Sequence, residues 1–266
     1  MSSTAVNRQH LAAELAEAER RQQPVPPFTE RYPDLSIADA YEIQKALIAA
    51  RVSAGARVWG RKVGLTSLAM QRALGVDEPD FGVVLDDMVL DQNLPVDCAR
   101  LIQPRIEAEI AIVLSGDLRG PGVTALDVLR ASAGVVPALE LIDSRIQDWR
   151  IKLVDTIADN ASSARVAVGS RLTRLDQVDL PRIGVCVTVN GDVVETGAGA
   201  AVLGDPLNCV AWLANKLSDF AEGLRAGEVI LSGAMHKAID VAPGNVIRAD
   251  FAYLGSIGLR FAGELA

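Results

Sequence analysis

Cysteine, histidine and aromatic residues are scarce in this chain. Its 266 residues include 3 cysteines and 2 histidines, and aromatic side chains make up 4% of the sequence. Cys98, Cys186 and Cys209 are far apart and form no CxxC motif, which argues against both a disulfide framework and a cysteine zinc site. With so few aromatic rings, the core must consist mainly of Ala, Val, Leu and Ile, in keeping with a hydrophobic fraction of 50%.

The chain also lacks a basic stripe and a long apolar run. Its net charge is −8, with 34 acidic and 26 basic residues, and this balance argues against nucleic acid as a partner. No apolar stretch reaches the roughly 18 to 20 residues that span a bilayer, and the first residues contain no apolar segment typical of signal peptides. We therefore expect a cytoplasmic protein with no membrane partner.

The N-terminal part of the sequence is predicted to be helical. Apolar residues recur at helical spacing in 5–22 and again after Ser36, a candidate N-cap, and the first segment is ended by three prolines within 24–27. Beyond residue 57 the pattern changes to strands and turns. We therefore expect an N-terminal helical section over 1–56 and a strand-rich domain over 57–266.

In that second part, strands outnumber helices. Asn190-Gly191 between two alternating segments predicts a hairpin with a type I′ turn. The predicted strands are 58–65, 82–90, 105–115, 185–189, 192–195, 227–233, 246–251 and 258–261. The predicted helices are 67–74, 124–133 and 205–217. Many strands with few interleaved helices favour an α+β fold.

Two glutamates alternate with apolar residues in the predicted strand 105–115. Glu107 and Glu109 are separated by Ala108, and residues two apart on a strand project from one face, about 7 Å apart. Carboxylates that close repel each other unless water or a cation separates them. Taken alone, a solvated strand face is the simpler interpretation of this pair.

Glu140 changes that interpretation. It lies in the apolar run 135–142, where we expect it to be buried, and buried acids are normally paired or bound to a metal. Three carboxylates suit a hard divalent cation such as Mg²⁺ or Mn²⁺, which takes oxygen ligands in octahedral geometry. The sequence therefore predicts a metal site formed by Glu107, Glu109 and Glu140.

Several long motifs resemble one enzyme family. They are 60–67 (GRKVGLTS), 75–82 (GVDEPDFG), 104–109 (PRIEAE), 155–163 (DTIADNASS) and 196–208 (TGAGAAVLGDPLN). In this order, over nearly the whole chain, they resemble the 2-hydroxypenta-2,4-dienoate (2-keto-4-pentenoate) hydratases and the related 4-oxalocrotonate decarboxylases of the fumarylacetoacetate-hydrolase-like superfamily. The resemblance implies that 57–266 is a catalytic domain built as a mixed β-roll with flanking helices, preceded by an N-terminal helical section, and that the protein is a homo-oligomer.

The resemblance also implies the site and the reaction. It gives the three glutamates as metal ligands, places Lys62 and Asp80 against the substrate, and puts Ser162 nearby. Without the motifs, we would interpret Lys62 as a surface lysine, Asp80 as a turn former and Ser162 as a cap. The implied substrate is a small 2-oxo or 2-hydroxy acid. Water would add to 2-hydroxypenta-2,4-dienoate to give 4-hydroxy-2-oxopentanoate in the meta-cleavage catabolism of aromatic rings or sterols.

Two other functions stay open at this point. One is decarboxylation of 2-oxohex-3-enedioate, which the same metal site would serve, and Asp143 resembles the decarboxylases where many hydratases have Gly. The other is a non-catalytic partner subunit, since a hydratase and a decarboxylase of this family can associate, as successive enzymes of one pathway. A hydrolytic triad would need His10 or His236 and has no supporting motif. The segment Met235-His236-Lys237 departs from known relatives and would alter substrate preference if it borders the pocket.

Overall fold

The computed structural model describes residues 6–68, 71–72 and 75–263. Its helices are α1 (Arg8–Arg21), α2 (Phe28–Arg31), α3 (Ile37–Ser53), α5 (Ala125–Ala131), α6 (Leu153–Ala158) and α7 (Pro206–Ser218). Its strands are β1 (Val58–Gly64), β2 (Asp80–Leu85), β3 (Arg105–Leu114), β4 (Ser132–Ile142), β5 (Ser163–Val168), β6 (Gly184–Val189), β7 (Asp192–Ala198), β8 (Val229–Ala234), β9 (Ile239–Asp240), β10 (Val246–Phe251) and β11 (Gly255–Arg260). Within these ranges, no helix is long and apolar enough to cross a membrane.

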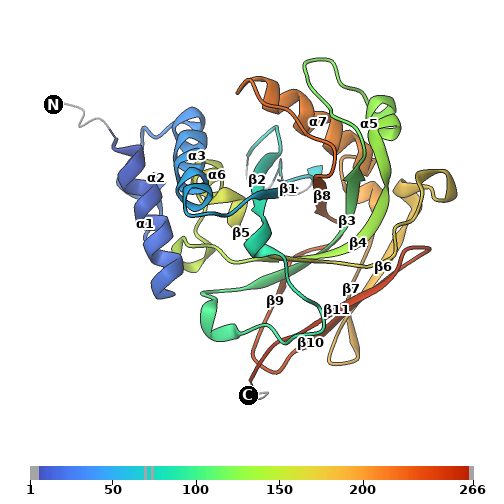
Figure 1. The fold of residues 1–266 in the computed structure, drawn as a ribbon. Coiled ribbons are helices and arrows are strands. Elements are labelled where there is room, and N and C mark those ends of the chain that lie inside the picture. Colours follow the sequence, from blue (N-terminus) through green and yellow to red (C-terminus); the bar gives the residue numbers. More distant parts are fainter. Residues whose placement is uncertain (1–5, 69–70, 73–74, 264–266) are drawn as a thin grey trace.

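The larger sheet is strongly curled. Its strand order is β2-β1-β8-β3-β4-β5, with β9 added beside β3, and β1 with β8 is a parallel pair in an otherwise antiparallel sheet. The two ends of the sheet approach each other, because the segment after β2 bonds to β5: the Leu90 N–H donates to the Val166 carbonyl over 2.8 Å. The sheet is therefore a roll with a concave interior, visible around β3, β4 and β8 in Figure 1.

A smaller sheet, β11-β10-β6-β7, lies beside the roll (Figure 1). Its β6–β7 connection is the predicted hairpin. Asn190 and Gly191 have φ angles of 55° and 95°, the left-handed conformation that both central residues of a type I′ turn require. The predicted α+β fold with a mixed β-roll and flanking helices is confirmed.

The outer face of the roll forms the main core. Because β3 alternates, Ile106, Ala108 and Ile110 point outward into a cluster that includes side chains of α7 and of the smaller sheet. Glu107 and Glu109 consequently point into the roll. Side chains at the far end of the interior are apolar, among them Ala111 and Ala138, so the charged residues occupy one end of the concave face.

The N-terminal helices reach the strand that carries Asp80. α3 begins with a capping box, in which the Ser36 hydroxyl and the Asp39 carboxylate each bond the other residue's backbone N–H. From the middle of this helix the buried Gln44 side chain donates to the Phe81 carbonyl over 2.9 Å and to the Ile157 carbonyl over 3.0 Å. The helical section is thus bonded to β2 and to α6. A division at residue 56 stays a prediction.

One predicted strand is too long, and several elements were not predicted. The strand predicted at 82–90 ends at Leu85, because Asp86 turns the chain by accepting the Arg57 N–H, and a 3-10 turn follows at Asp86–Met88. The strands β4 and β5 and the helix α6 were missed, since their apolar runs carry no clear period. Half of the helix predicted at 67–74, namely 69–70 and 73–74, lies outside the described residues.

Candidate active site

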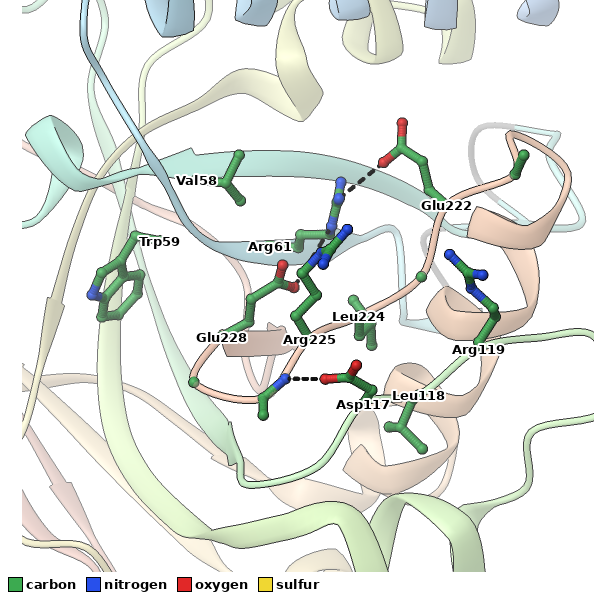
Figure 2. A pocket seen from close by; sticks show the side chains of 14 residues that line it. Val58, Trp59, Arg61, Asp117, Leu118, Arg119, Glu222, Leu224, Arg225 and Glu228 are labelled. Atoms are coloured by element: carbon green, nitrogen blue, oxygen red, sulfur yellow. Dashed lines mark hydrogen bonds and ion pairs between the residues drawn. The ribbon is translucent and has the colours of Figure 1, made fainter.

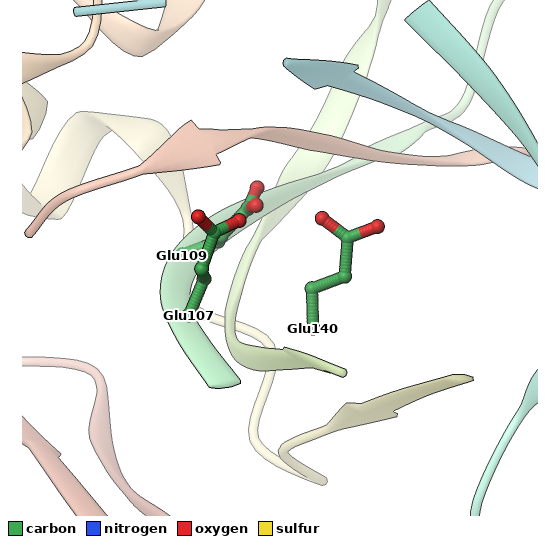
Figure 3. A group of neighbouring side chains, drawn as sticks. All are labelled: Glu107, Glu109 and Glu140. Carbon is green, nitrogen blue, oxygen red and sulfur yellow. The ribbon is translucent and has the colours of Figure 1, made fainter. Parts of the chain in front are cut away.

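The three glutamates meet inside the roll. Glu107 and Glu140 are directly opposed partners on the antiparallel strands β3 and β4, and Glu109 is one pleat further along β3. One carboxylate oxygen from each residue lies within 4.8 Å of the others. In Figure 3 the three side chains rise from neighbouring strands with their carboxylates close together. Like charges directly opposite in a sheet are destabilising, so the arrangement calls for a cation.

Burial intensifies this repulsion. Glu109 and Glu140 are 1% and 0% exposed, and Glu107 is half-buried. Desolvation, reinforced by neighbouring carboxylates, raises the pKa of Glu107 to about 7. The same causes raise the pKa of Glu109 well above its ordinary value. Without a compensating charge, this pocket therefore favours protonated acids.

Several carboxylate oxygens of the triad accept no hydrogen bond from the described residues, which leaves them available to a metal ion. The Gly233 N–H donates to Oε2 of Glu109 over 2.6 Å. Among the described residues, neither oxygen of Glu140 has a hydrogen-bond partner. Buried carboxylates are normally paired or bound to a metal, and the lone pairs left on Glu140 are ones that a cation can fill. Three hard oxygen donors suit Mg²⁺ or Mn²⁺, with further positions for water and substrate, so the residues present fit such an ion.

Lys62 supplies the cation that faces the triad. Its Nζ lies 3.3 Å from Oε2 of Glu140 and donates to the Ala161 carbonyl over 2.9 Å. Burial disfavours the charged amine, but Glu140 and Asp80 outweigh it and raise the pKa of Lys62. The amine is therefore charged at neutral pH. It reaches the triad from β1 because the sheet curls.

Asp80 lies on the same interior surface, at the start of β2. It is the register partner of Gly64, and a side chain at that glycine would begin 2.2 Å from Oδ1 of Asp80. The Thr156 hydroxyl donates to Oδ2 over 3.2 Å, whereas Oδ1 has no partner among the described residues. Burial raises the pKa of Asp80. Its free oxygen and raised proton affinity are properties of a proton-transfer group.

A left-handed segment holds Lys62 in place. Asn160, Ala161 and Ser162 have φ angles of 54°, 50° and 54°, a conformation that costs non-glycine residues about 1–2 kcal/mol each. The Asn160 side chain accepts the Val83 N–H and donates to the Val83 carbonyl, which fixes the segment to β2. This segment was not predicted, because its only local signal in the sequence is an asparagine, a residue that tolerates positive φ.

Ser162 belongs to the same left-handed segment. Its hydroxyl is 3.4 Å from Oδ2 of the buried Asp159, and its carbonyl accepts the Asp143 N–H. The structure therefore puts Ser162 next to the carbonyl that binds Lys62. Its contact with a substrate stays a prediction.

Asp143 has a structural role. Its carboxylate accepts the backbone N–H groups of Ile102 and Gln103, the latter over 2.7 Å. Burial raises the pKa of Asp143, against the effect of these bonds. Because the carboxylate is committed to the loop before β3, its presence does not distinguish a decarboxylase from a hydratase.

A separate cleft of about 960 Å³ lies on the other face of β1. Figure 2 shows Arg61 near its centre, paired with Glu222 and close to Glu228. The cleft is lined by three arginines and three acidic residues. These charges balance, so the cleft has no surplus charge for an ionic ligand, and it contains none of the triad.

Comparison with known proteins places this geometry in a family. The model of the fumarylacetoacetate (FAA) hydrolase C-terminal family matches residues 68–262. A 2-keto-4-pentenoate hydratase of Paraburkholderia xenovorans is 45% identical over 258 residues, 97% of this chain and 96% of the relative. A 4-oxalocrotonate decarboxylase of Pseudomonas putida is 42% identical over 251 residues, 94% and 95% of the two chains.

A solved structure agrees with these relatives. The 4-oxalocrotonate decarboxylase from Pseudomonas putida G7, complexed with magnesium and adipate, superposes with a TM-score of 0.94 at 40% identity, covering 98% of this chain and 99% of that one. Sequence and fold therefore agree over nearly the full length. The chain belongs to the fumarylacetoacetate hydrolase family.

Proposed function

We propose that this protein is a metal-dependent hydratase of 2-hydroxypenta-2,4-dienoate. The observation that carries the proposal is the set of three carboxylates within 4.8 Å of one another, faced by Lys62. Asp80 lies nearby, and its Oδ1 has no hydrogen-bond partner in the described part of the chain. Relatives named as 2-keto-4-pentenoate hydratases and a similar structure that holds magnesium support it. Glu107, Glu109 and Glu140 would hold Mg²⁺ or Mn²⁺.

The bound cation would supply Lewis-acid stabilisation of negative charge at C2 of a 2-oxo or 2-hydroxy acid. Lys62, held by the Ala161 carbonyl, would bind the carboxylate of the substrate. Both roles use fixed charges in a buried site, where electrostatic interactions are stronger than in water.

Asp80 would transfer the protons. Hydration requires a proton at C5, the far carbon of the dienol, while the 2-hydroxyl gives up its proton. The water that adds at C4 then loses a proton, and C3 of the resulting enolate gains one. A buried carboxyl with a raised pKa can donate and accept protons in turn. Its second oxygen is held by Thr156, so Oδ1 is the oxygen available to the substrate. Ser162 would bond the substrate from the adjacent left-handed segment.

Decarboxylation of 2-oxohex-3-enedioate is the second candidate, because a decarboxylase shares this fold at 40% identity and was solved with the diacid adipate. A diacid needs a second positive partner. Arg105 is a further cation near the triad, and its charge lowers the pKa of Glu107. Its guanidinium, however, is paired with Asp240 over 2.8 Å and lies 4.5 Å from the Trp149 ring centroid. Because Arg105 already has these partners, it is not free to bind a second carboxylate, and this favours a substrate with one carboxylate.

The test is the ultraviolet loss of 2-hydroxypenta-2,4-dienoate with purified protein, in Mn²⁺, Mg²⁺ or EDTA, with 2-oxohex-3-enedioate in parallel. We expect metal-dependent consumption of the monoacid and little CO₂ from the diacid. CO₂ release from the diacid with the monoacid untouched would replace hydratase by decarboxylase. No turnover of either would favour a non-catalytic partner subunit.

The same proposal includes assembly and location. A homo-oligomer, association with the next enzyme of the pathway and a cytoplasmic location stay predictions. Size-exclusion chromatography with light scattering, alone and with the next enzyme, would measure the first two.

A further inference from the structure

The imidazole of His236 is bonded to the backbone between two of the acidic residues. The Ala108 N–H donates to Nε2 of His236 over 2.9 Å, and the Ala108 carbonyl accepts the Met235 N–H over 3.1 Å. Ala108 stands between Glu107 and Glu109 on β3. Both backbone groups of this residue are therefore held by the segment that follows β8.

The bond from the Ala108 N–H to His236 takes the place of a backbone hydrogen bond that β8 does not supply. β8 ends at Ala234, opposite Glu109, and the β3–β8 register is irregular between Glu109 and Ala111. Beyond Ala234, an imidazole nitrogen takes the place of a strand carbonyl as acceptor for Ala108. Without it, a backbone N–H would lose its partner beside the acidic cluster, which is costly for a buried donor.

His236 is set up as an acceptor. Its Nδ1 is 2.7 Å from the Lys237 carbonyl, so Nδ1 carries the proton and Nε2 keeps its lone pair. Burial lowers the pKa of His236, against the effect of the Lys237 carbonyl. The neutral tautomer that the geometry requires is thus the favoured one.

We propose that His236 is a positioning residue for the metal site, which fixes the spacing of the Glu107 and Glu109 carboxylates through the Ala108 N–H. The inference rests on the proposed metal centre. A cation with octahedral preferences depends on ligand spacing, and residues that orient ligands typically change metal affinity by about 10- to 100-fold when replaced. The effect of His236 is therefore expected in binding of the ion itself.

The experiment measures Mn²⁺ binding by electron paramagnetic resonance, without substrate. His236→Leu keeps bulk but removes the acceptor, and we expect about tenfold weaker binding and an altered spectrum of bound Mn²⁺. His236→Gln places an amide oxygen near the position of Nε2, and we expect affinity within about threefold of the unchanged protein, since the acceptor is restored. If the leucine variant does not fold, His236→Ala also removes the acceptor, and we expect the same weakening of Mn²⁺ binding.

Ser132→Ala is the matched control. It removes a bond of 2.7 Å from the Ser132 hydroxyl to the Val128 carbonyl at the far end of β4, so Mn²⁺ affinity should not change. Absence of Mn²⁺ binding to the unchanged protein would overturn the metal site itself. Normal binding that is equal in the leucine variant, or equally weakened in the control, would overturn only the role of His236. Failure of the folded glutamine variant to recover affinity would do the same.

Discussion

Two clusters of buried charge lie close together in this molecule and differ in how they are satisfied. In one, Arg145 donates from Nε to Asp159 over 2.5 Å, and its other nitrogens donate to backbone carbonyls of Asp143, Asp159 and Ser163. In the other, the three glutamates have one nearby lysine, and Glu140 has no hydrogen-bond partner among the described residues.

The comparison shows which property marks the candidate site. Both clusters are buried, and burial raises the pKa of acids in both: to about 6 for Asp159 and to about 7 for Glu107. Burial and shifted pKa values therefore do not separate them. The two clusters differ in the lone pairs of Glu140, which remain available, whereas a fully hydrogen-bonded ion pair has no capacity left for a ligand. The first cluster holds the fold, and the second is available for chemistry.

Glu140→Gln should give the largest effect. Loss of one ligand charge should abolish tight Mn²⁺ binding and lower kcat/KM about 1000-fold, equal to about 4 kcal/mol of transition-state stabilisation. Steady-state kinetics and Mn²⁺ titration would measure both. Glu42→Gln, on the exposed side of α3, is the control and should change neither. Full activity of the Glu140 variant would remove the distinction between the clusters.

Arg145→Met should affect stability instead. It leaves Asp159 buried without its partner, which costs about 3–5 kcal/mol of unfolding free energy. Urea denaturation would measure the loss, and the double variant with Asp159→Asn should recover part of it. The folded fraction should keep its Mn²⁺ affinity. If affinity falls as far as in the Glu140 variant, the two clusters are not separate.

The free energy of unfolding of the metal-free protein should decrease as the pH rises. Glu107 titrates near 7 in the folded state, above its ordinary value of 4.5, so between these values the folded state holds more protons than the unfolded state. The stabilising contribution of the protonated acids is therefore complete below about pH 4.5 and is lost as pH rises through about 7. Thermal unfolding at pH 5 and pH 8 would show it.

Saturating Mn²⁺ should reduce this dependence, because the cation balances the carboxylates. Glu107→Gln should reduce it in the metal-free protein as well. If Mn²⁺ leaves the pH dependence of stability unchanged, that dependence comes from groups outside the triad.

Thr156→Val should have the smallest effect. It removes the hydrogen bond of 3.2 Å to Asp80, which is worth about 0.5–1.5 kcal/mol, so kcat should fall about 2- to 10-fold with KM little changed. Thr156→Ser retains the hydroxyl and should stay close to the unchanged enzyme. A rise in KM alone would mean that Thr156 binds the substrate directly.

Much of the molecule followed from local sequence patterns. The alternation in β3 predicted that Glu107 and Glu109 share a face, and the Asn190-Gly191 pair predicted the hairpin turn. Both depend on the backbone geometry of a few neighbouring residues, which the sequence encodes directly. The long motifs predicted the family, which the comparisons confirm.

The burial of Glu140 in an apolar run suggested that it joins the other two glutamates, but only the tertiary structure decided how these distant groups meet. Glu107 and Glu140 are opposed because of the β3–β4 register, and Lys62 reaches them because the sheet curls. Asp143 and Asp159 look as acidic in sequence as Glu140, yet hydrogen bonds occupy their oxygens. The sequence determined the residue types and the local alternation. Register, curvature and hydrogen-bond satisfaction depend on contacts between residues far apart in the chain, and no local pattern encodes them.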